Sequence, residues 1–334
     1  MLAAIKKELA LRKDELEPRP LKSLYFGGGT PSLISPDEIR SLTDEVLNYF
    51  DFDPEIEITL EANPDDLDQQ FLKELSGSHI NRLSIGTQSF FDADLALMNR
   101  AHSGEQAENS IRRAQDHGFE NLSIDLIYGS PVSGFDVWKD NLDKAVSLDV
   151  PHISSYALTV EPKTALNDWI AKGKVEVPKE SAQNREFYYM SDVLKSKGFQ
   201  HYEISNFAKP GFHSRHNSAY WQYQPYLGVG PSAHSYNGKD IRSWNVSNNS
   251  LYLRNLNQNI LPLEAEQLSD KDQFNEMLMI GLRTVWGVDL DRLEETIPVE
   301  EFGKFKNTVQ QKTLDGVLQI EGRMLKIPDK HWFM

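Results

Sequence analysis

Strand-like and helix-like segments alternate through the first half of the chain, and this alternation limits the fold more than any other feature. An apolar strand is expected to end near Phe26, and apolar residues at helical spacing follow it. Further strands are expected at residues 57–63, 82–88, 121–129 and 152–159, with helices at 36–48, 67–75, 104–117 and 135–148. Strands that alternate with helices form parallel βαβ units, so we expect an α/β fold, either a barrel or a doubly wound sheet.

Polar side chains gather at the carboxyl ends of these strands. They are Thr30, Glu61, Asn63, Gln88, Asp125, Tyr128 and Tyr156. Both candidate folds bring the carboxyl ends of the strands to one edge, where ligands bind. The Gly27-Gly28-Gly29 turn lets backbone approach a ligand closely, although a turn that needs glycine only for its shape is the alternative. Two carboxylates at such an edge, Glu61 and Asp125, also leave a glycosidase layout open.

The composition excludes several classes of site and partner. Among 334 residues, 35 Lys and Arg stand against 50 Asp and Glu, a net charge of −15, which argues against nucleic-acid and anionic-membrane partners. No apolar run reaches the roughly 18 residues of a transmembrane helix, and no signal peptide is recognisable, so we expect a cytoplasmic protein. The chain has no cysteine, which rules out disulfides and thiolate metal sites within it. The sequence does not fix the oligomeric state, and a homodimer is one option.

The second half of the chain differs in character. A helix is expected over residues 181–197, and the stretch 201–236 is rich in Tyr, Trp and His. Such side chains could dock a flat ring system and ligate iron, and the alternative is an aromatic layer packed over the core. Helices and a hairpin after Ser269 indicate a small winged-helix-like module, whose acidic residues favour a structural or docking role over DNA binding. We expect three domains, at residues 1–180, 181–265 and 266–334.

Common catalytic motifs are absent. The sequence has no G-x-S-x-G elbow, H-E-x-x-H helix, phosphate-binding loop or G-x-G-x-x-G fingerprint. The usual hydrolase, NTPase and dehydrogenase readings are therefore weak.

Five separated blocks nevertheless agree with one known family, in the family's order. They are Gly27-Gly28-Gly29-Thr30-Pro31-Ser32, Leu60-Glu61-Ala62-Asn63-Pro64, Ser84-Ile85-Gly86-Thr87-Gln88-Ser89-Phe90, Asp125-Leu126-Ile127-Tyr128-Gly129 and His216-Asn217-Ser218-Ala219-Tyr220-Trp221. With these blocks the chain resembles the radical SAM coproporphyrinogen III oxidase-like family, and its haem chaperone branch in particular. The resemblance implies a partial TIM-type (β/α)6 barrel that lacks its first strand, followed by a small α+β, winged-helix-like C-terminal domain.

The resemblance also implies two cofactor sites. For S-adenosylmethionine (SAM), it implies contacts from Gly28, Gly29 and Thr30 to the methionine part, and from Glu61, Gln88, Arg100 and Asp125 to the amino-acid and ribose groups. For haem, it implies the motif His216, Asn217, Tyr220 and Trp221, with His216 as the iron ligand and His234 as a lesser candidate.

The chain departs from the family at the iron–sulfur cluster. Family members hold a [4Fe–4S] cluster on a Cys-x-x-x-Cys-x-x-Cys loop after the first strand, and this chain has no cysteine. We expect Met1 to be an internal methionine of a longer protein that carries this loop, and a cysteine-free relative is the alternative. In either case these residues cannot bind the cluster.

Three functions follow from the resemblance. The first is a haem-binding chaperone that binds SAM and delivers haem to haem-dependent respiratory enzymes. The alternative is an oxygen-independent coproporphyrinogen III oxidase, which decarboxylates propionate side chains by radical chemistry. The third is a cluster-free structural relative.

Overall fold

The computed structural model describes residues 1–333, which form two compact units that interleave along the chain. The barrel unit contains residues 24–36, 57–213 and 333, and the terminal unit contains residues 1–23, 37–56 and 214–332. Each unit is described on its own. The predicted division into three domains at residues 1–180, 181–265 and 266–334 stays a prediction.

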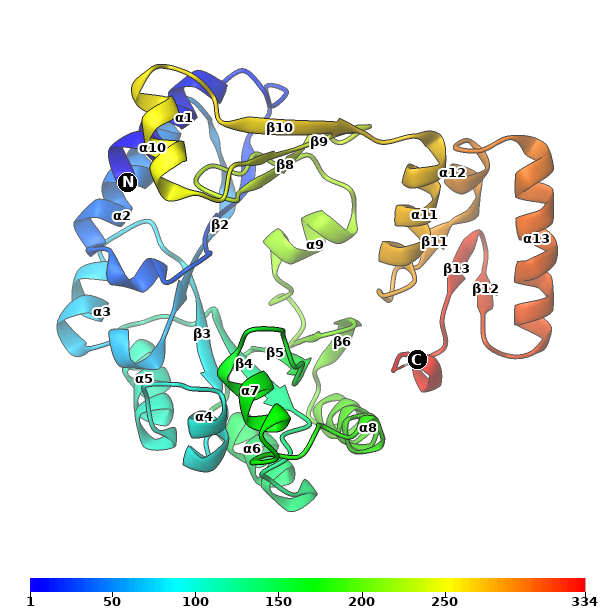
Figure 1. Cartoon of the computed structure of the whole chain (residues 1–334), viewed down its shortest axis with the longest axis horizontal. Coiled ribbons are helices and arrows are strands. Elements are labelled where there is room, and N and C mark those ends of the chain that lie inside the picture. The colour runs from blue at the N-terminus through cyan, green and yellow to red at the C-terminus, as the bar shows by residue number, and fades with distance from the viewer. Residues whose placement is uncertain (334) are drawn as a thin grey trace. The chain divides into compact units, whose positions relative to one another are not determined.

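A seven-stranded sheet has the strand order β1-β2-β3-β4-β5-β7-β6 (Figure 1). The strands are β1 Leu21–Phe26, β2 Phe52–Ala62, β3 Arg82–Gln88, β4 Leu122–Tyr128, β5 His152–Ala157, β6 Gln200–Glu203 and β7 Asn206–Ala208. Strands β2 to β5 are parallel, as the alternating pattern predicts, and the α/β partial-barrel fold is confirmed. The sheet then ends in an antiparallel pair, β7 and β6, which the sequence pattern did not predict.

Helices of the barrel unit cover one face of this sheet (Figure 1). They are α3 Gln69–Leu75, α4 Asp92–Leu97, α5 Gly104–Asp116, α6 Phe135–Ser147, α7 Ala165–Ala171 and α8 Glu180–Ser196, with short 3-10 turns η1 Pro31–Leu33 and η2 Pro64–Asp66. Strand side chains alternate between two faces, so apolar residues such as Leu83 and Ile85 are fully buried. The opposite face of β2 to β5 carries the polar residues, including Glu61, Ser84 and Asp125, and this inverted arrangement makes room for a polar site.

The terminal unit holds two small antiparallel sheets, ordered β10-β9-β8 and β11-β13-β12. Its strands are β8 His234–Tyr236, β9 Ile241–Asn245, β10 Leu263–Gln267, β11 Val288–Asp289, β12 Gln319–Glu321 and β13 Met324–Lys326. Its helices are α1 Leu2–Arg12, α2 Pro36–Leu47, α9 Arg215–Trp221, α10 Asn249–Asn257, α11 Asp270–Gly281, α12 Leu290–Glu294 and α13 Val299–Leu314, with the 3-10 turn η3 Asp329–His331. From α11 onward, helices pack on the β11-β13-β12 sheet around Phe274, Leu293, Phe302 and Leu325, which gives the expected small α+β module.

A buried ionic network fixes α1 against β8, β9 and α10. Arg12 and Glu8 are both fully buried and pair at 2.8 Å. Arg12 also donates to the Ser235 hydroxyl at 3.0 Å, while Glu8 accepts from Asn245 at 2.7 Å and from the Tyr252 hydroxyl at 2.5 Å. Helices α1 and α10, far apart in sequence, therefore lie side by side (Figure 1). Within residues 1–333, no helix is long and apolar enough to cross a membrane.

Candidate functional site

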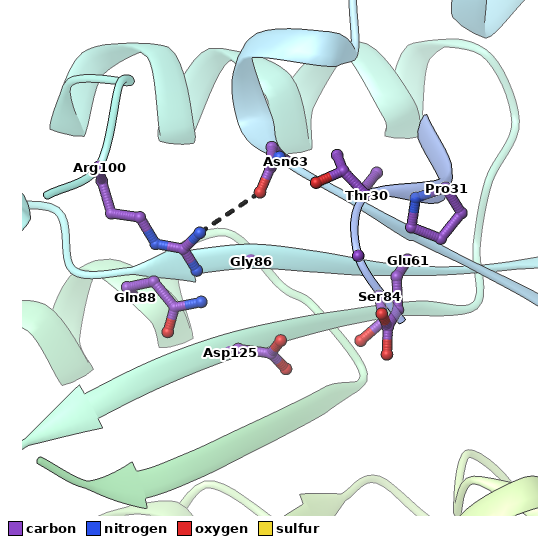
Figure 2. Close-up of a pocket in the computed structure, with 11 residues that line it drawn as sticks. Thr30, Pro31, Glu61, Asn63, Ser84, Gly86, Gln88, Arg100 and Asp125 are labelled. Carbon is purple, nitrogen blue, oxygen red and sulfur yellow. Dashed lines mark hydrogen bonds between the residues drawn. The ribbon is translucent and has the colours of Figure 1, made fainter. Parts of the chain in front are cut away.

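A polar cavity of about 180 Å³ lies at the carboxyl ends of the parallel strands in the barrel unit. Figure 2 shows the side chains that point into it from the turn after β1, from β2, β3 and β4, and from the segment after α4. The lining residues are Gly29, Thr30, Pro31, Glu61, Ala62, Asn63, Ser84, Gly86, Gln88, Arg100 and Asp125. Carboxylates, amides, hydroxyls and one guanidinium thus converge on a single space, as ligand sites of this fold class require.

The glycine turn is held against the cavity by Glu61. One carboxylate oxygen accepts from the Tyr25 hydroxyl at 2.7 Å, and the other accepts from the backbone N–H of Gly28 at 3.1 Å. Gly28 and Gly29 have φ angles of 79° and 70°, which only glycine adopts without strain. Gly27 is needed for space, because a Cβ there would lie 2.5 Å from the Tyr25 ring and 3.0 Å from a Glu61 oxygen. Burial and the charge of Glu61 raise the pKa of Tyr25, so its hydroxyl remains a donor.

Arg100 supplies the positive charge of the cavity. Its guanidinium donates to the Asn63 side-chain oxygen at 3.4 Å (Figure 2) and remains charged although burial lowers its pKa. Gly86 leaves room for this group, because a Cβ there would lie 3.4 Å from Arg100 and 3.2 Å from the Gln88 amide nitrogen. Gln88 itself has a left-handed φ of 63°, next to a register shift between β3 and β4 that aims its side chain into the cavity.

Asp125 lies in the middle of β4 at the floor of the cavity. Burial raises the pKa of its carboxyl to about 7, and the negative charge of Glu61 acts in the same direction. A hydrogen bond from Ser154 and the charges of Arg100 and Arg82 oppose that increase. Near pH 7 the carboxyl is therefore divided between its neutral and ionised forms, and a cationic ligand would favour the ionised form.

The structure brings the predicted SAM residues together in this cavity. Gly29, Thr30, Glu61, Gln88, Arg100 and Asp125 line it, and Gly28 contacts Glu61. Sequence reasoning did not assign a role to Tyr25, Ser84 or Gly86. Ser84, Gly86 and Gln88 are spaced by two on β3 and so share one strand face. Because Gln88 was a predicted site residue, this spacing could have identified Ser84 and Gly86 from the sequence.

The motif residues His216, Asn217, Tyr220 and Trp221 lie on helix α9 of the terminal unit. The motif contains two pairs at i,i+4 spacing, so its four side chains share one side of the helix. The His216 and Tyr220 rings meet edge to face at 4.9 Å, and Tyr220 meets Tyr226 in the same way at 4.6 Å.

His216 is half-buried, and the Ser23 hydroxyl lies 3.5 Å from its Nδ1. Burial lowers the pKa of His216 to about 4, so the imidazole is neutral at physiological pH, the form that ligates metals. His234, the lesser candidate, lies on β8 instead, where its ring faces Trp244 at 6.1 Å.

Comparison with known proteins finds family matches in both the N-terminal and the C-terminal part of the chain. The Radical SAM superfamily profile matches residues 4–145, and the HemN C-terminal domain profile matches residues 268–334. The chain is 36% identical over 282 residues to Heme chaperone HemW of Lactococcus lactis, covering 83% of this chain and 73% of that protein. It is 33% identical over 300 residues to Heme chaperone HemW of Bacillus subtilis, covering 89% of this chain and 79% of that protein. The chain belongs to the HemW-type family of radical SAM proteins.

A solved structure shows that the HemW-type chain shares its fold with an enzyme. Coproporphyrinogen III oxidase (HemN) of Escherichia coli matches with a TM-score of 0.83 at 21% identity, covering 99% of this chain and 80% of that one. At this identity the match establishes the fold and not the activity. The expected family and the partial-barrel fold are thus confirmed.

The two cofactors implied by the radical SAM family fit these residues differently. Iron–sulfur clusters are held by cysteine thiolates, and none of the 334 residues is a cysteine, so the [4Fe–4S] cluster does not fit this chain. The cavity does suit SAM, whose ammonium, carboxylate and ribose hydroxyls match carboxylates, a guanidinium and open glycine backbone. Nothing lies within 4 Å of the Cβ positions of Gly28 and Gly29, so a ligand can approach the turn directly.

Proposed function

We propose that this chain is a haem chaperone, which binds haem on α9, binds SAM in the cavity of the barrel unit, and delivers haem to haem-dependent respiratory enzymes. The observation that carries the proposal is the helix that presents His216, Asn217, Tyr220 and Trp221 on one side, in a chain whose relatives are named haem chaperones. The assignment of each residue rests on this chain's own contacts.

Helix α9 has the features of a docking surface for a flat, iron-bearing ring. None of its seven residues is fully buried, although the helix carries three ring-bearing side chains. Its position is nevertheless fixed, because Ser214 caps it by accepting from the Asn217 N–H, and Arg215 pairs with Glu55 at 2.9 Å. A neutral His216 imidazole would ligate the iron, and the Tyr220 and Trp221 rings would contact the apolar macrocycle.

In the cavity, SAM would take the place for which Glu61, Arg100 and Asp125 are arranged. Glu61, beside the glycine turn, would hold the ammonium group, and Arg100 would pair with the carboxylate. Asp125 would accept hydrogen bonds from the ribose hydroxyls, and Gln88 would donate hydrogen bonds to them or accept hydrogen bonds from them. Bound SAM would contribute positive charge that balances the two carboxylates, and this chain has no cluster ligands with which to cleave it reductively.

An oxygen-independent coproporphyrinogen III oxidase is the second candidate, and the fold match to the Escherichia coli enzyme is the observation that favours it. The lack of cysteine in this chain counts against it, because the radical reaction depends on the cluster. Conversion of coproporphyrinogen by a longer, cluster-loaded protein that contains this chain would reverse the order of the two candidates.

Haem titration followed by absorbance tests the proposal. We expect His216→Ala to weaken haem binding at least about tenfold, a loss of about 1.4 kcal/mol, and to abolish the spectral signature of an imidazole ligand. His117→Ala is the control, since His117 lies on the barrel unit and contacts the Arg113 carbonyl at 2.8 Å. His234→Ala separates the two candidate ligands: a loss confined to that variant would move the site to β8, and unchanged binding in both variants would refute the site.

The acceptors, the location and the oligomeric state remain predictions. Transfer of haem from the loaded chain to an apo respiratory enzyme would test the first, cell fractionation would test the expected cytoplasmic location, and sedimentation would test a homodimer. The acidic balance of the chain, −15, supports the expectation that nucleic acid is not a partner.

A further inference from the structure

A line of buried polar side chains leads away from the cavity along β4 and β5. Ser123 and Asp125 are two residues apart on β4, and His152 and Ser154 are two residues apart on β5. The strand register places Ser123 opposite His152 and Asp125 opposite Ser154. All four side chains therefore share one face of the sheet, with Asp125 at the cavity end.

These side chains form a continuous hydrogen-bonded chain. Ser154 lies opposite Asp125 in the strand register and acts on its carboxyl as a hydrogen-bond donor, and the Ser154 hydroxyl lies 3.3 Å from that of Ser123. The Ser123 hydroxyl lies 2.7 Å from Nδ1 of His152, and Nε2 of His152 lies 2.8 Å from the Tyr202 hydroxyl. Apart from Asp125, each member is at most 4% exposed. Buried polar groups in such a network depend on one another for satisfied hydrogen bonds.

The row of hydrogen bonds from Asp125 to Tyr202 has two consistent arrangements of its hydrogen atoms. With Asp125 ionised, Ser154 donates to it, Ser123 donates to Ser154, and the Nδ1–H of His152 donates to Ser123, which leaves Nε2 to accept from Tyr202. With Asp125 protonated by solvent in the cavity, every bond can reverse, so that Ser123 donates to Nδ1 and Nε2–H donates to Tyr202. The imidazole carries one N–H in both arrangements, because burial keeps the pKa of His152 well below its ordinary value.

Other charged and titratable groups face Asp125 and His152 and influence the protonation of both. Asp125 faces Tyr25 of β1, Glu61 of β2, Arg82 of β3, Tyr156 of β5 and Arg100. His152 faces Arg82 and His213. These groups shift the pH at which Asp125 changes its charge. The hydrogen bonds through Ser123 and Ser154 couple that charge to the tautomer of His152.

We propose that His152 is a positioning residue of the cavity, whose tautomer is coupled to the charge of Asp125 through Ser123 and Ser154. A cationic ligand in the cavity selects the ionised carboxylate and with it the Nδ1–H tautomer of His152, and by reciprocity that tautomer favours the ligand. The effect of a bound ligand on the His152 tautomer rests on the proposed function of the cavity as a SAM site. The effect of Asp125 protonation on that tautomer does not.

Nitrogen-15 NMR of the full chain labelled at the histidine imidazoles tests the coupling directly. Between pH 5.5 and 8.5, without ligand, we expect the two ring-nitrogen shifts of His152 to exchange character, from Nε2–H at low pH to Nδ1–H at high pH. Asp125→Asn should abolish this change, and Ser123→Ala should uncouple it while the chain stays folded by circular dichroism. A His152 tautomer that is constant across this range in the unmodified chain, or a transition that survives in Asp125→Asn, would overturn the proposal.

Ser191→Ala is the matched control. Ser191 and His201 form a similar buried pair in the same unit, with 3.2 Å between the hydroxyl and Nδ1. The His152 transition should persist in this variant, and its loss would show that any buried Ser–His disturbance acts on His152. If Ser123→Ala fails to fold, Tyr202→Phe breaks the opposite end of the chain and should shift the transition by at least half a pH unit; no shift would refute the coupling.

Addition of SAM at pH 6 supplies the second readout. We expect the His152 tautomer to move toward Nδ1–H as the cavity fills. A failure of SAM to bind would contradict the proposed function and leave the proton-linked transition intact, whereas SAM binding with an unchanged tautomer would contradict only the coupling.

Discussion

The hydroxyl of Tyr25 donates a 2.7 Å hydrogen bond to Glu61, and this bond orients the carboxylate before any ligand arrives. The Gly28 N–H holds the second oxygen of the same carboxylate at 3.1 Å. Glu61 is therefore fixed between a strand residue and the glycine turn. A site whose charged groups are already in place loses less conformational freedom when it binds.

Tyr25→Phe removes this bond and little else. We expect the affinity for SAM to fall about three- to tenfold, because the variant loses the orienting effect of a hydrogen bond to a charged group, and such a bond is worth about 1.5 to 3 kcal/mol in total. Isothermal titration calorimetry measures the change. Tyr49→Phe is the control, since Tyr49, two residues after the end of α2, donates to Glu45 of that helix at 3.0 Å, and the variant should leave SAM affinity unchanged. Equal effects of the two variants would contradict a role for Tyr25 in orienting the cavity.

Gly86→Ala tests whether the floor of the cavity needs the missing side chain. The new Cβ would lie 3.2 Å from Gln88 and 3.4 Å from Arg100, so both side chains must move. We expect about a tenfold loss of SAM affinity with a small change in unfolding temperature. Gly303→Ala in α13 has open space around its Cβ and should stabilise the helix by about 1 kcal/mol without changing affinity. Normal SAM affinity in Gly86→Ala would show that the ligand does not depend on this arrangement.

The parallel part of the sheet could be predicted from the sequence because its signal is local. Strand β3 was expected at residues 82–88 and lies there, since Leu83 and Ile85 face the helices and give a regular apolar alternation. The chain of Ser123, His152 and Ser154 could not be predicted, because polar residues at alternate strand positions normally indicate a solvated face. Only the curled sheet turns that face inward.

Helix α9 shows the other limit of sequence reasoning. The motif residues were identified by resemblance, but the helix that arranges them was not expected, because His, Asn, Tyr and Trp have low or average helix propensity. The helix is positioned by a contact distant in sequence, the Arg215 side chain on the Glu55 carbonyl at 2.5 Å. Contacts of this kind leave no trace in local periodicity.

Asp125→Asn should change the pH dependence of stability and binding in opposite directions. The native pKa of Asp125, about 7, lies above its ordinary value of 3.8. The native state therefore holds this proton more tightly than the unfolded state, so the carboxyl destabilises the native state progressively as pH rises from about 4 to 7. We expect Asp125→Asn to be more stable than the unmodified chain at pH 8, by up to about 4 kcal/mol for a shift of this size, and about equally stable at pH 4.

Binding measurements complete this prediction. If SAM requires the ionised carboxylate, its affinity for the unmodified chain should fall about tenfold for each pH unit well below 7, and Asp125→Asn should bind weakly at every pH. Urea unfolding and calorimetry at pH 4, 6 and 8 supply the measurements. A variant that is less stable at pH 8, or that keeps the pH dependence of binding, would show that another group titrates.

Arg12→Ala should be the most destabilising of these substitutions, because it leaves a buried carboxylate without its partner. Glu8 would keep its bonds from Asn245 and Tyr252 but lose the charge at 2.8 Å that balances it. Breaking a buried ion pair by removing one member costs about 3 to 5 kcal/mol. The pair Glu108 and Arg112 has the same i,i+4 spacing on α5, with Arg112 exposed, and Arg112→Ala should cost less than about 1 kcal/mol. Urea unfolding followed by circular dichroism compares the two, and similar losses would mean that Arg12 is not held in the dry network that fixes α1 to α10.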